Sequence, residues 1–96
     1  MRGAIASLDL YLFDADAKPR RVTLTITAPE RQAAGPGWVC RLALADLRRP
    51  ESVAGIDSVA ALASALDRAR SWVADLRASG LVICRDRAGE TPFEPF

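Results

Sequence analysis

Cys40 and Cys84 are the strongest nucleophiles in the sequence, and they are the first candidates for a catalytic site. A catalytic thiol needs a neighbouring base or cation to become a thiolate at neutral pH. The sequence contains no histidine. Arg41 and Arg85 each directly follow a cysteine on a predicted strand, so their side chains point to the opposite face. Because free cysteines on strands are usually small buried hydrophobic residues, we predict two buried, unpaired thiols with no catalytic role.

Asp14 and Asp16 are the best-placed pair of carboxylates, because they bracket a short polar turn. Two carboxylates on one loop can hold a hard cation such as Mg²⁺. Acidic residues in a hairpin turn are, however, typical of turn geometry, and the later acidic ligands of a calcium loop are missing. With no histidine to complete a zinc site, we expect no metal, no cofactor and no catalytic residue.

The segment Gly55-Ile56-Asp57-Ser58 precedes a predicted helix, which is where phosphate-binding loops occur. It has a single glycine and no lysine, and Asp57 stands where an anion would bind. An aspartate or serine at this position typically accepts a hydrogen bond from a free N–H of the first helical turn. The segment therefore predicts a helix cap and not a phosphate site.

Arginine pairs at Arg20-Arg21 and Arg48-Arg49 raise the possibility of nucleic-acid binding. Tyr11 and Phe13 share one face of a predicted strand, where aromatic side chains could stack on bases. The net charge is only +1, which is low for a dedicated nucleic-acid-binding domain, and no RNA-binding motif is present. Nucleic-acid or nucleotide binding on this aromatic face is therefore the second hypothesis and not the first.

Two runs of alternating apolar and polar residues predict a β-hairpin near the N-terminus. The first run extends from Ile5 to Phe13 and the second from Val22 to Thr27, with a turn ending at Pro19 between them. A similar run over 38–45 and a short, wholly apolar run over 81–84 predict two further strands. The predicted core face of the first three strands comprises Leu8, Leu10, Leu12, Val22, Leu24, Ile26, Trp38, Cys40, Leu42 and Leu44.

One long helix is predicted from Ser58 to Ser79. Asp57 is its expected N-cap, and Ile56 is expected to pack onto the first turn as a hydrophobic staple. Gly80 supplies the C-terminal stop. The stripe expected to face the sheet recurs at intervals of three and four residues: Val59, Leu62, Leu66, Ala69, Val73 and Leu76.

The remaining segments are predicted to be irregular. Pro29 to Gly37 and Asp46 to Gly55 are rich in turn residues, and 87–96 is expected to be an extended tail. The predicted fold is therefore α+β with the order β-β-β-α-β: an antiparallel meander with one long helix packed on one face. The 96 residues are enough for a single domain spanning 1–96.

Composition limits the cellular setting. Half of the residues are hydrophobic and 26% are charged, which is ordinary for a globular domain. No apolar run is long enough to span a membrane or to form a signal peptide, so we expect a cytoplasmic protein that does not bind membranes. All but one of the 13 basic residues are arginine, Lys18 being the exception, and this bias is typical of a GC-rich bacterial genome.

The chain resembles a family of small bacterial proteins known only as domains of unknown function. The resemblance extends from Val22 to Leu76 and depends on Ala28-Pro29-Glu30, Trp38-Val39-Cys40 and above all on Val53-Ala54-Gly55-Ile56-Asp57-Ser58 before an Ala/Leu-rich helix. Such proteins often have a glutamine in the first helical turn, where this chain has Ala60. The resemblance implies a small α+β domain and no particular activity.

Apolar residues outside the predicted core favour an interaction surface. Trp72 lies at the edge of the helix stripe, and we expect it near an exposed overhang together with the phenylalanines of the tail; alternatively, the tail folds back and covers this surface within one chain. Our first hypothesis is therefore a non-enzymatic protein-interaction module that acts as a homodimer or with an unknown protein partner. Nucleic-acid or nucleotide binding is the second hypothesis, and a small enzyme that uses carboxylates and arginines is the third. The candidate interface residues are Tyr11, Phe13, Trp72, Phe93 and Phe96.

Overall fold

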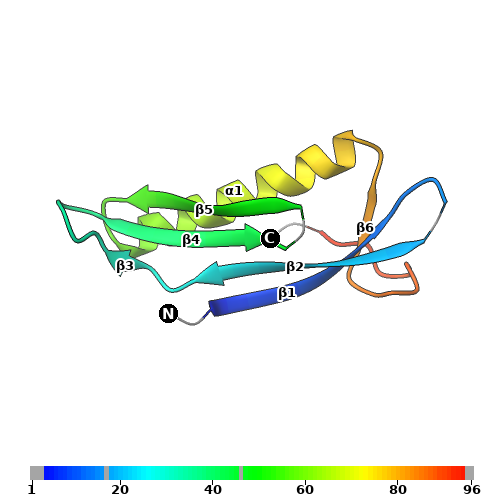
Figure 1. Ribbon diagram of the computed structural model, residues 1–96, viewed down its shortest axis with the longest axis horizontal. Helices are drawn as coiled ribbons and strands as arrows, with labels where there is room; N and C mark the ends of the chain where they lie inside the picture. Colours follow the sequence, from blue (N-terminus) through cyan, green and yellow to red (C-terminus); the bar gives the residue numbers. More distant parts are fainter. Residues whose placement is uncertain (1–3, 17, 46, 95–96) are drawn as a thin grey trace.

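The fold is α+β, as predicted, and consists of an antiparallel sheet with one helix packed on one face (Figure 1). The computed structural model describes residues 4–16, 18–45 and 47–94. The elements in chain order are β1 (Ala4–Phe13), β2 (Pro19–Thr27), β3 (Glu30–Arg31), β4 (Trp38–Leu44), β5 (Arg48–Gly55), α1 (Ser58–Ala78) and β6 (Val82–Cys84).

The strands lie in the order β5-β4-β2-β1-β6, and every pair is antiparallel. The predicted β1–β2 hairpin is confirmed, with Leu8 opposite Leu24 on the core face. The two-residue strand β3 continues beyond β2 along the same side of β4. The predicted core face of the first three strands is confirmed, except that Leu8 and Trp38 are only half-buried.

The β2–β4 ladder ends at Thr27, where the chain turns toward Pro29 and β3. The Thr27 hydroxyl accepts a 3.1 Å hydrogen bond from the Arg41 N–H, in place of a backbone carbonyl. The Cys40 thiol donates a 3.0 Å bond to the Thr27 carbonyl oxygen. These side-chain bonds satisfy backbone groups that the departure of β2 would otherwise leave without partners.

The prediction of an irregular segment from Asp46 to Gly55 is wrong from Arg48 onward, because this segment forms strand β5. It pairs with β4 along nearly its whole length, with Cys40 opposite Val53. The alternation that marks a strand is absent because β5 is an edge strand with no fully buried side chain. Glu51, which shares the helix-facing side with Val53, forms an ion pair with Arg68 of α1 and contributes no apolar residue to the pattern.

The bounds and caps of α1 match the prediction. The Asp57 carboxylate accepts a 2.7 Å hydrogen bond from the Ala60 N–H at the first turn. At the other end, Gly80 adopts a φ of 98° and its N–H donates to the Arg77 carbonyl, while the N–H of Leu81 donates to the Leu76 carbonyl. This is a Schellman motif, which requires a residue that tolerates positive φ after the helix.

Ala69 and Val73 of the predicted helix stripe are buried, as predicted, but the face that α1 buries is centred on alanines to one side of that stripe. Ala61, Ala65 and Ala69 are fully buried at intervals of four residues, whereas Val59 is 75% exposed. Small side chains let the helix axis approach the sheet closely, and the leucines flank this contact and are half-buried. The predicted hydrophobic staple is also wrong, because the Ile56 side chain is 89% exposed.

The segment after β6 folds back, so the prediction of an extended tail is wrong for its described part. The Asp86 carboxylate accepts hydrogen bonds from the N–H groups of Glu90 and Thr91 and closes a turn. The chain then returns beside β6, where the Phe93 N–H donates a 2.9 Å bond to the Ile83 carbonyl. This return places the Phe93 ring in the core under α1, with none of its surface exposed.

Candidate functional site

The two thiols have the environment of structural residues. Cys40 and Cys84 are unpaired and buried, as predicted. Burial raises the pKa of the Cys40 thiol, although its hydrogen bond with the Arg41 backbone acts in the opposite direction. A raised pKa keeps the thiol protonated and unreactive at neutral pH.

The carboxylates do not converge on a site either. Within residues 4–16, 18–45 and 47–94, no group of three or more cysteine, aspartate or glutamate side chains could hold a metal ion. Asp14 accepts a hydrogen bond from the Asp16 N–H, which is the turn geometry expected of that pair. Asp9 accepts a 2.7 Å bond from the Thr23 hydroxyl across the hairpin.

The interface candidates separate into two groups. Trp72 and Phe93 are buried in the core of a single chain, at 3% and 0% exposure, so the expected position of Trp72 near an exposed overhang is wrong. Tyr11 and Phe13 are half-buried on the sheet face opposite α1. The turn at Gly89 packs so closely on Phe13 that a Cβ there would lie 3.2 Å from its ring. Phe96 lies outside the described residues.

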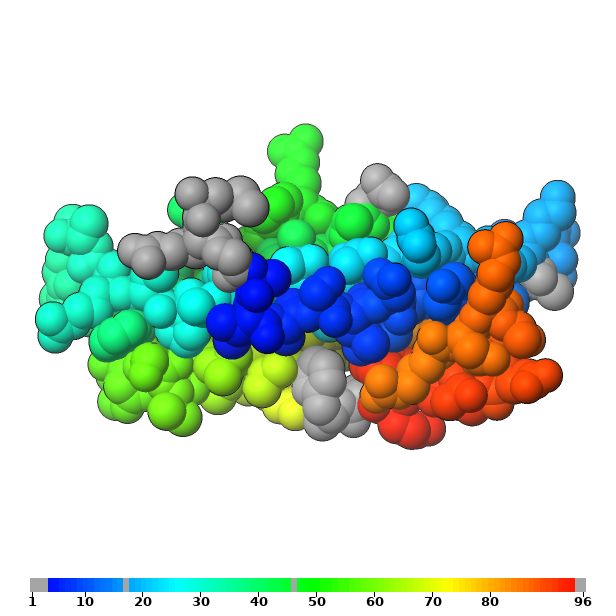
Figure 2. Space-filling view, turned by 90° about the horizontal axis from the view of Figure 1, so that it is seen from below, coloured from blue at the N-terminus to red at the C-terminus, as the bar shows by residue number. Residues whose placement is uncertain are grey.

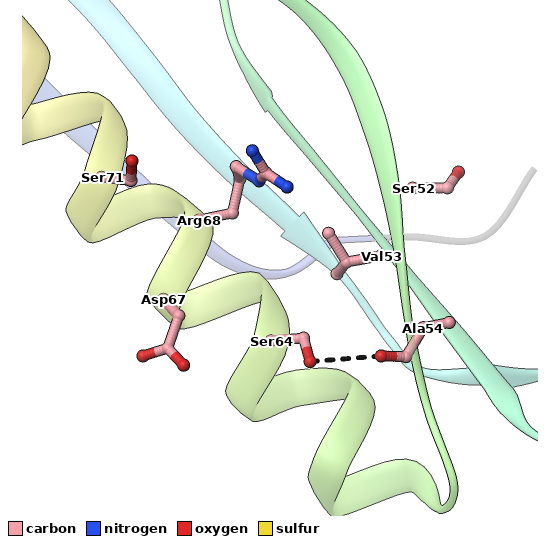
Figure 3. A pocket seen from close by; sticks show the side chains of 7 residues that line it. All are labelled: Ser52, Val53, Ala54, Ser64, Asp67, Arg68 and Ser71. Carbon is pink, nitrogen blue, oxygen red and sulfur yellow. Dashed lines mark hydrogen bonds between the residues drawn. The ribbon is translucent and has the colours of Figure 1, made fainter.

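The two edges of the sheet offer the remaining candidate surfaces, and the edge at β5 is closed by α1 (Figure 3). The Ser64 hydroxyl donates a 3.1 Å hydrogen bond to the Ala54 carbonyl, which points away from β4 toward the helix. Pro50, beside the bulge of β5, has no N–H to offer. The ion pair of Arg68 with Glu51 links the same two elements. Prolines and covering helices are how natural sheets protect an edge from pairing with another chain.

A groove of about 470 Å³ separates β5 from α1 at this edge. Figure 3 shows the Arg68 side chain extending from α1 toward β5. The groove contains three serines. The Ser64 hydroxyl is bonded to the Ala54 carbonyl and the Asp67 carboxylate to Arg70, so these two groups do not form the pairing that activates a serine nucleophile. Its lining residues are Ser52, Val53, Ala54, Ser64, Asp67, Arg68 and Ser71.

The opposite edge belongs to β1, and the hydrogen bonds of the hairpin fix the direction of its backbone groups. The Thr23 carbonyl accepts a 3.0 Å bond from the Ala45 N–H, so Thr23 turns its backbone groups toward β4. Successive residues of a strand alternate in this direction. Leu24 therefore turns its N–H and C=O toward β1, where it bonds with Leu8 directly opposite.

By the same alternation, Ser7 and Asp9 of β1 point their N–H and C=O groups away from β2, toward the open edge. Strand β6 covers this edge only at Tyr11–Phe13. No other strand of the described chain pairs with Ala4–Leu10 on that side. The free edge of β1, meaning the outward side of Ala4–Leu10, thus presents an unsatisfied row of donors and acceptors.

The composition of the free edge of β1 gives it little protection. It has no proline or lysine, and its one charged residue is Asp9, whose carboxylate is held by Thr23 on the face of the sheet. Ile5 is 53% exposed and Leu8 is half-buried. Figure 2 looks directly onto this edge and shows the blue β1 surface uncovered along the middle of the molecule.

Ser7 and Asp9 are not among the interface residues predicted from the sequence. The alternation from Ile5 to Phe13 predicts a strand, but it does not tell which backbone edge lacks a partner. A signal was nevertheless available. The run 81–84 is much shorter than the run it pairs with, and a short strand cannot cover a long one.

Comparison with known proteins gives a family but no activity. The family model described as a domain of unknown function, DUF6968, matches residues 9–93, and the chain belongs to this family. No curated protein and no solved structure matches the chain. Among the described residues, no helix is long and apolar enough to cross a membrane.

Proposed function

We propose that this DUF6968 domain is a non-enzymatic protein-interaction module that acts as a homodimer, in which the free β1 edges of two copies pair antiparallel. The observation that carries the proposal is the unprotected edge over Ala4–Leu10. A strand edge is self-complementary, because Ser7 and Asp9 each offer one donor and one acceptor to the same groups of a second copy. Pairing about a two-fold axis would join two sheets into one.

The charge of the chain favours this self-association. The net charge of +1 produces little repulsion between two copies. The Asp9 carboxylate already accepts a hydrogen bond from the Thr23 hydroxyl, so it would keep this partner if the interface excluded water from it. The half-buried Leu8 side chains of two copies would come together on the helix-facing side and extend the core.

The size of the exposed surface also supports a dimer. A folded monomer of 10.3 kDa is expected to expose about 5,400 Å². This chain exposes 6222 Å². The excess is roughly 800–900 Å², which is close to the area that each partner contributes to a standard interface. The radius of gyration of 14.6 Å likewise exceeds the roughly 12.5 Å expected for a compact chain of this length.

The other hypotheses receive less support. Base stacking needs exposed rings, whereas Tyr11 and Phe13 are half-buried and the Gly89 turn packs on Phe13. The enzyme hypothesis needs convergent catalytic groups, and neither the thiols nor the carboxylates described above converge. The proposal includes a bacterial cytoplasmic setting, where buried reduced thiols such as Cys40 are normal.

The experiment compares the molar mass of three proteins by sedimentation equilibrium: the wild type, Ser7→Pro and Ser52→Pro. Both substitutions place proline where a backbone N–H points off an edge, on β1 and on β5 respectively, so neither removes a ladder bond within the chain. We expect wild type and Ser52→Pro at twice the 10.3 kDa chain mass and Ser7→Pro at the monomer mass. A monomeric wild type, or a dimeric Ser7→Pro with unchanged circular dichroism, contradicts the proposal.

A further inference from the structure

The sheet face opposite α1 contains a hollow of about 490 Å³ above β4. It lies where β2 ends at Thr27 and β3 begins at Glu30, and Pro50 of β5 forms its other side. Its volume is within the range of sites for small ligands. The hollow is lined by Thr25, Thr27, Ala28, Glu30, Val39, Arg41, Leu42, Ala43 and Pro50.

The floor of the hollow is largely apolar, and the side chains of Val39 and Ala43 there are small. Val39, Arg41 and Ala43 alternate along β4 and so share the face opposite α1. Val39 and Ala43 leave space open above the backbone, whereas longer side chains at these two positions would fill it. Thr25 and Thr27 continue the lining of the hollow onto β2.

Arg41 supplies the one positive charge among the residues that line the hollow. Its backbone is fixed by the bond to the Thr27 hydroxyl. Its guanidinium forms no ion pair with any residue that the structure describes. Glu30 of β3 lines the hollow as well. It lies directly opposite Val39 of β4, two residues before Arg41. An anion would therefore be attracted to the Arg41 end of the hollow.

We infer that this hollow binds a small organic monocarboxylate, with its apolar body on Val39 and Ala43 and its carboxylate paired with Arg41. The ligand class follows from complementarity of shape and charge: an apolar floor for the body and one planar cation with several N–H donors for the anion. The inference is independent of the homodimer, because the hollow lies over β4 and the free edge lies on β1.

The test is a titration with 1-naphthoate and its neutral analogue 1-naphthamide, followed by backbone amide chemical shifts. We expect naphthoate to shift the amides of Thr25, Val39 and Ala43. Arg41→Gln should raise the dissociation constant for naphthoate by about fivefold or more, the order expected for losing one partly exposed charge-assisted contact. The dissociation constant for naphthamide should be the same in both proteins.

Two control variants separate the hollow from general charge effects. Arg21→Gln removes an exposed arginine of β2 that does not line the hollow, and it should leave naphthoate binding unchanged. Ala43→Leu fills the floor and should weaken the binding of both probes. Shifts outside the hollow, or equal naphthoate binding by wild type and Arg41→Gln, would overturn the inference.

Discussion

The Ser64 hydroxyl of α1 donates a 3.1 Å hydrogen bond to the Ala54 carbonyl of β5. This bond ties the helix to one edge of the sheet, and the opposite edge at β1 has no equivalent cover. A sheet with one closed and one open edge can pair only once, because pairing consumes the open edge. Self-association through β1 therefore gives a closed two-fold dimer and not a filament.

Replacement of Ser64 by alanine should lower the free energy of unfolding by about 1 kcal/mol, because the Ala54 carbonyl loses its partner beside the helix. Chemical denaturation of Ser64→Ala measures this loss. Ser71→Ala is the matched control, since Ser71 lines the same groove and is exposed. Its effect should stay within about 0.5 kcal/mol. Equal effects of the two substitutions would show that the Ser64 bond does not stabilise the edge.

Replacement of Phe93 by alanine should cost about 3–5 kcal/mol, because its ring is fully buried against the core of the same chain. The half-buried Phe13 provides the comparison, and Phe13→Ala should cost less. Denaturation at low and high protein concentration distinguishes the origin of the loss. If the tail packs within one chain, the loss caused by Phe93→Ala is the same at both concentrations. A loss found only at high concentration would mean that the tail packs on a second copy.

The turn after β6 should open in acid. Hydrogen bonds from the backbone N–H groups of Thr91 and Glu90 hold the pKa of Asp86 below its usual value of 3.8. A carboxyl with a depressed folded-state pKa stabilises the turn above its unfolded pKa, and this contribution is lost as the pH falls through the folded value. We expect the Thr91 amide resonance to move below about pH 4 and the change to disappear in Asp86→Asn. A midpoint above the ordinary aspartate pKa would contradict this assignment.

The elements with strong periodicity could be predicted from the sequence. The hairpin, the helix bounds and the buried thiols follow from alternation, capping residues and residue type. Strand β5 could not be predicted in this way, because an edge strand that buries mainly Val53 shows no alternation. Its pairing depends on β4 and its position depends on α1, and both are tertiary effects that override local propensity.

Errors in the helix surroundings have a similar cause. The apolar pattern correctly included Ala69 and Val73, but it also favoured the leucines and Val59. The face that packs on the sheet is centred on alanines, which permit closer approach. Ile56 is exposed at the tight entry into α1. A Cβ on Gly55 would lie 2.2 Å from the Ala61 nitrogen, so the glycine is required by contact with the helix backbone. Such contacts between elements cannot be read from residue spacing.

Amide hydrogen exchange at Ser7 and Asp9 tests the paired β1 edge most directly. In a monomer both N–H groups point to solvent and exchange freely, whereas in the dimer both donate to the second copy. Ser52 serves as the reference within the same protein, because it is exposed and its N–H points off the β5 edge into the open groove beside α1. We predict exchange at Ser7 and Asp9 that is at least about tenfold slower than at Ser52 and that accelerates on dilution. Fast exchange at all three amides at high concentration would contradict the account.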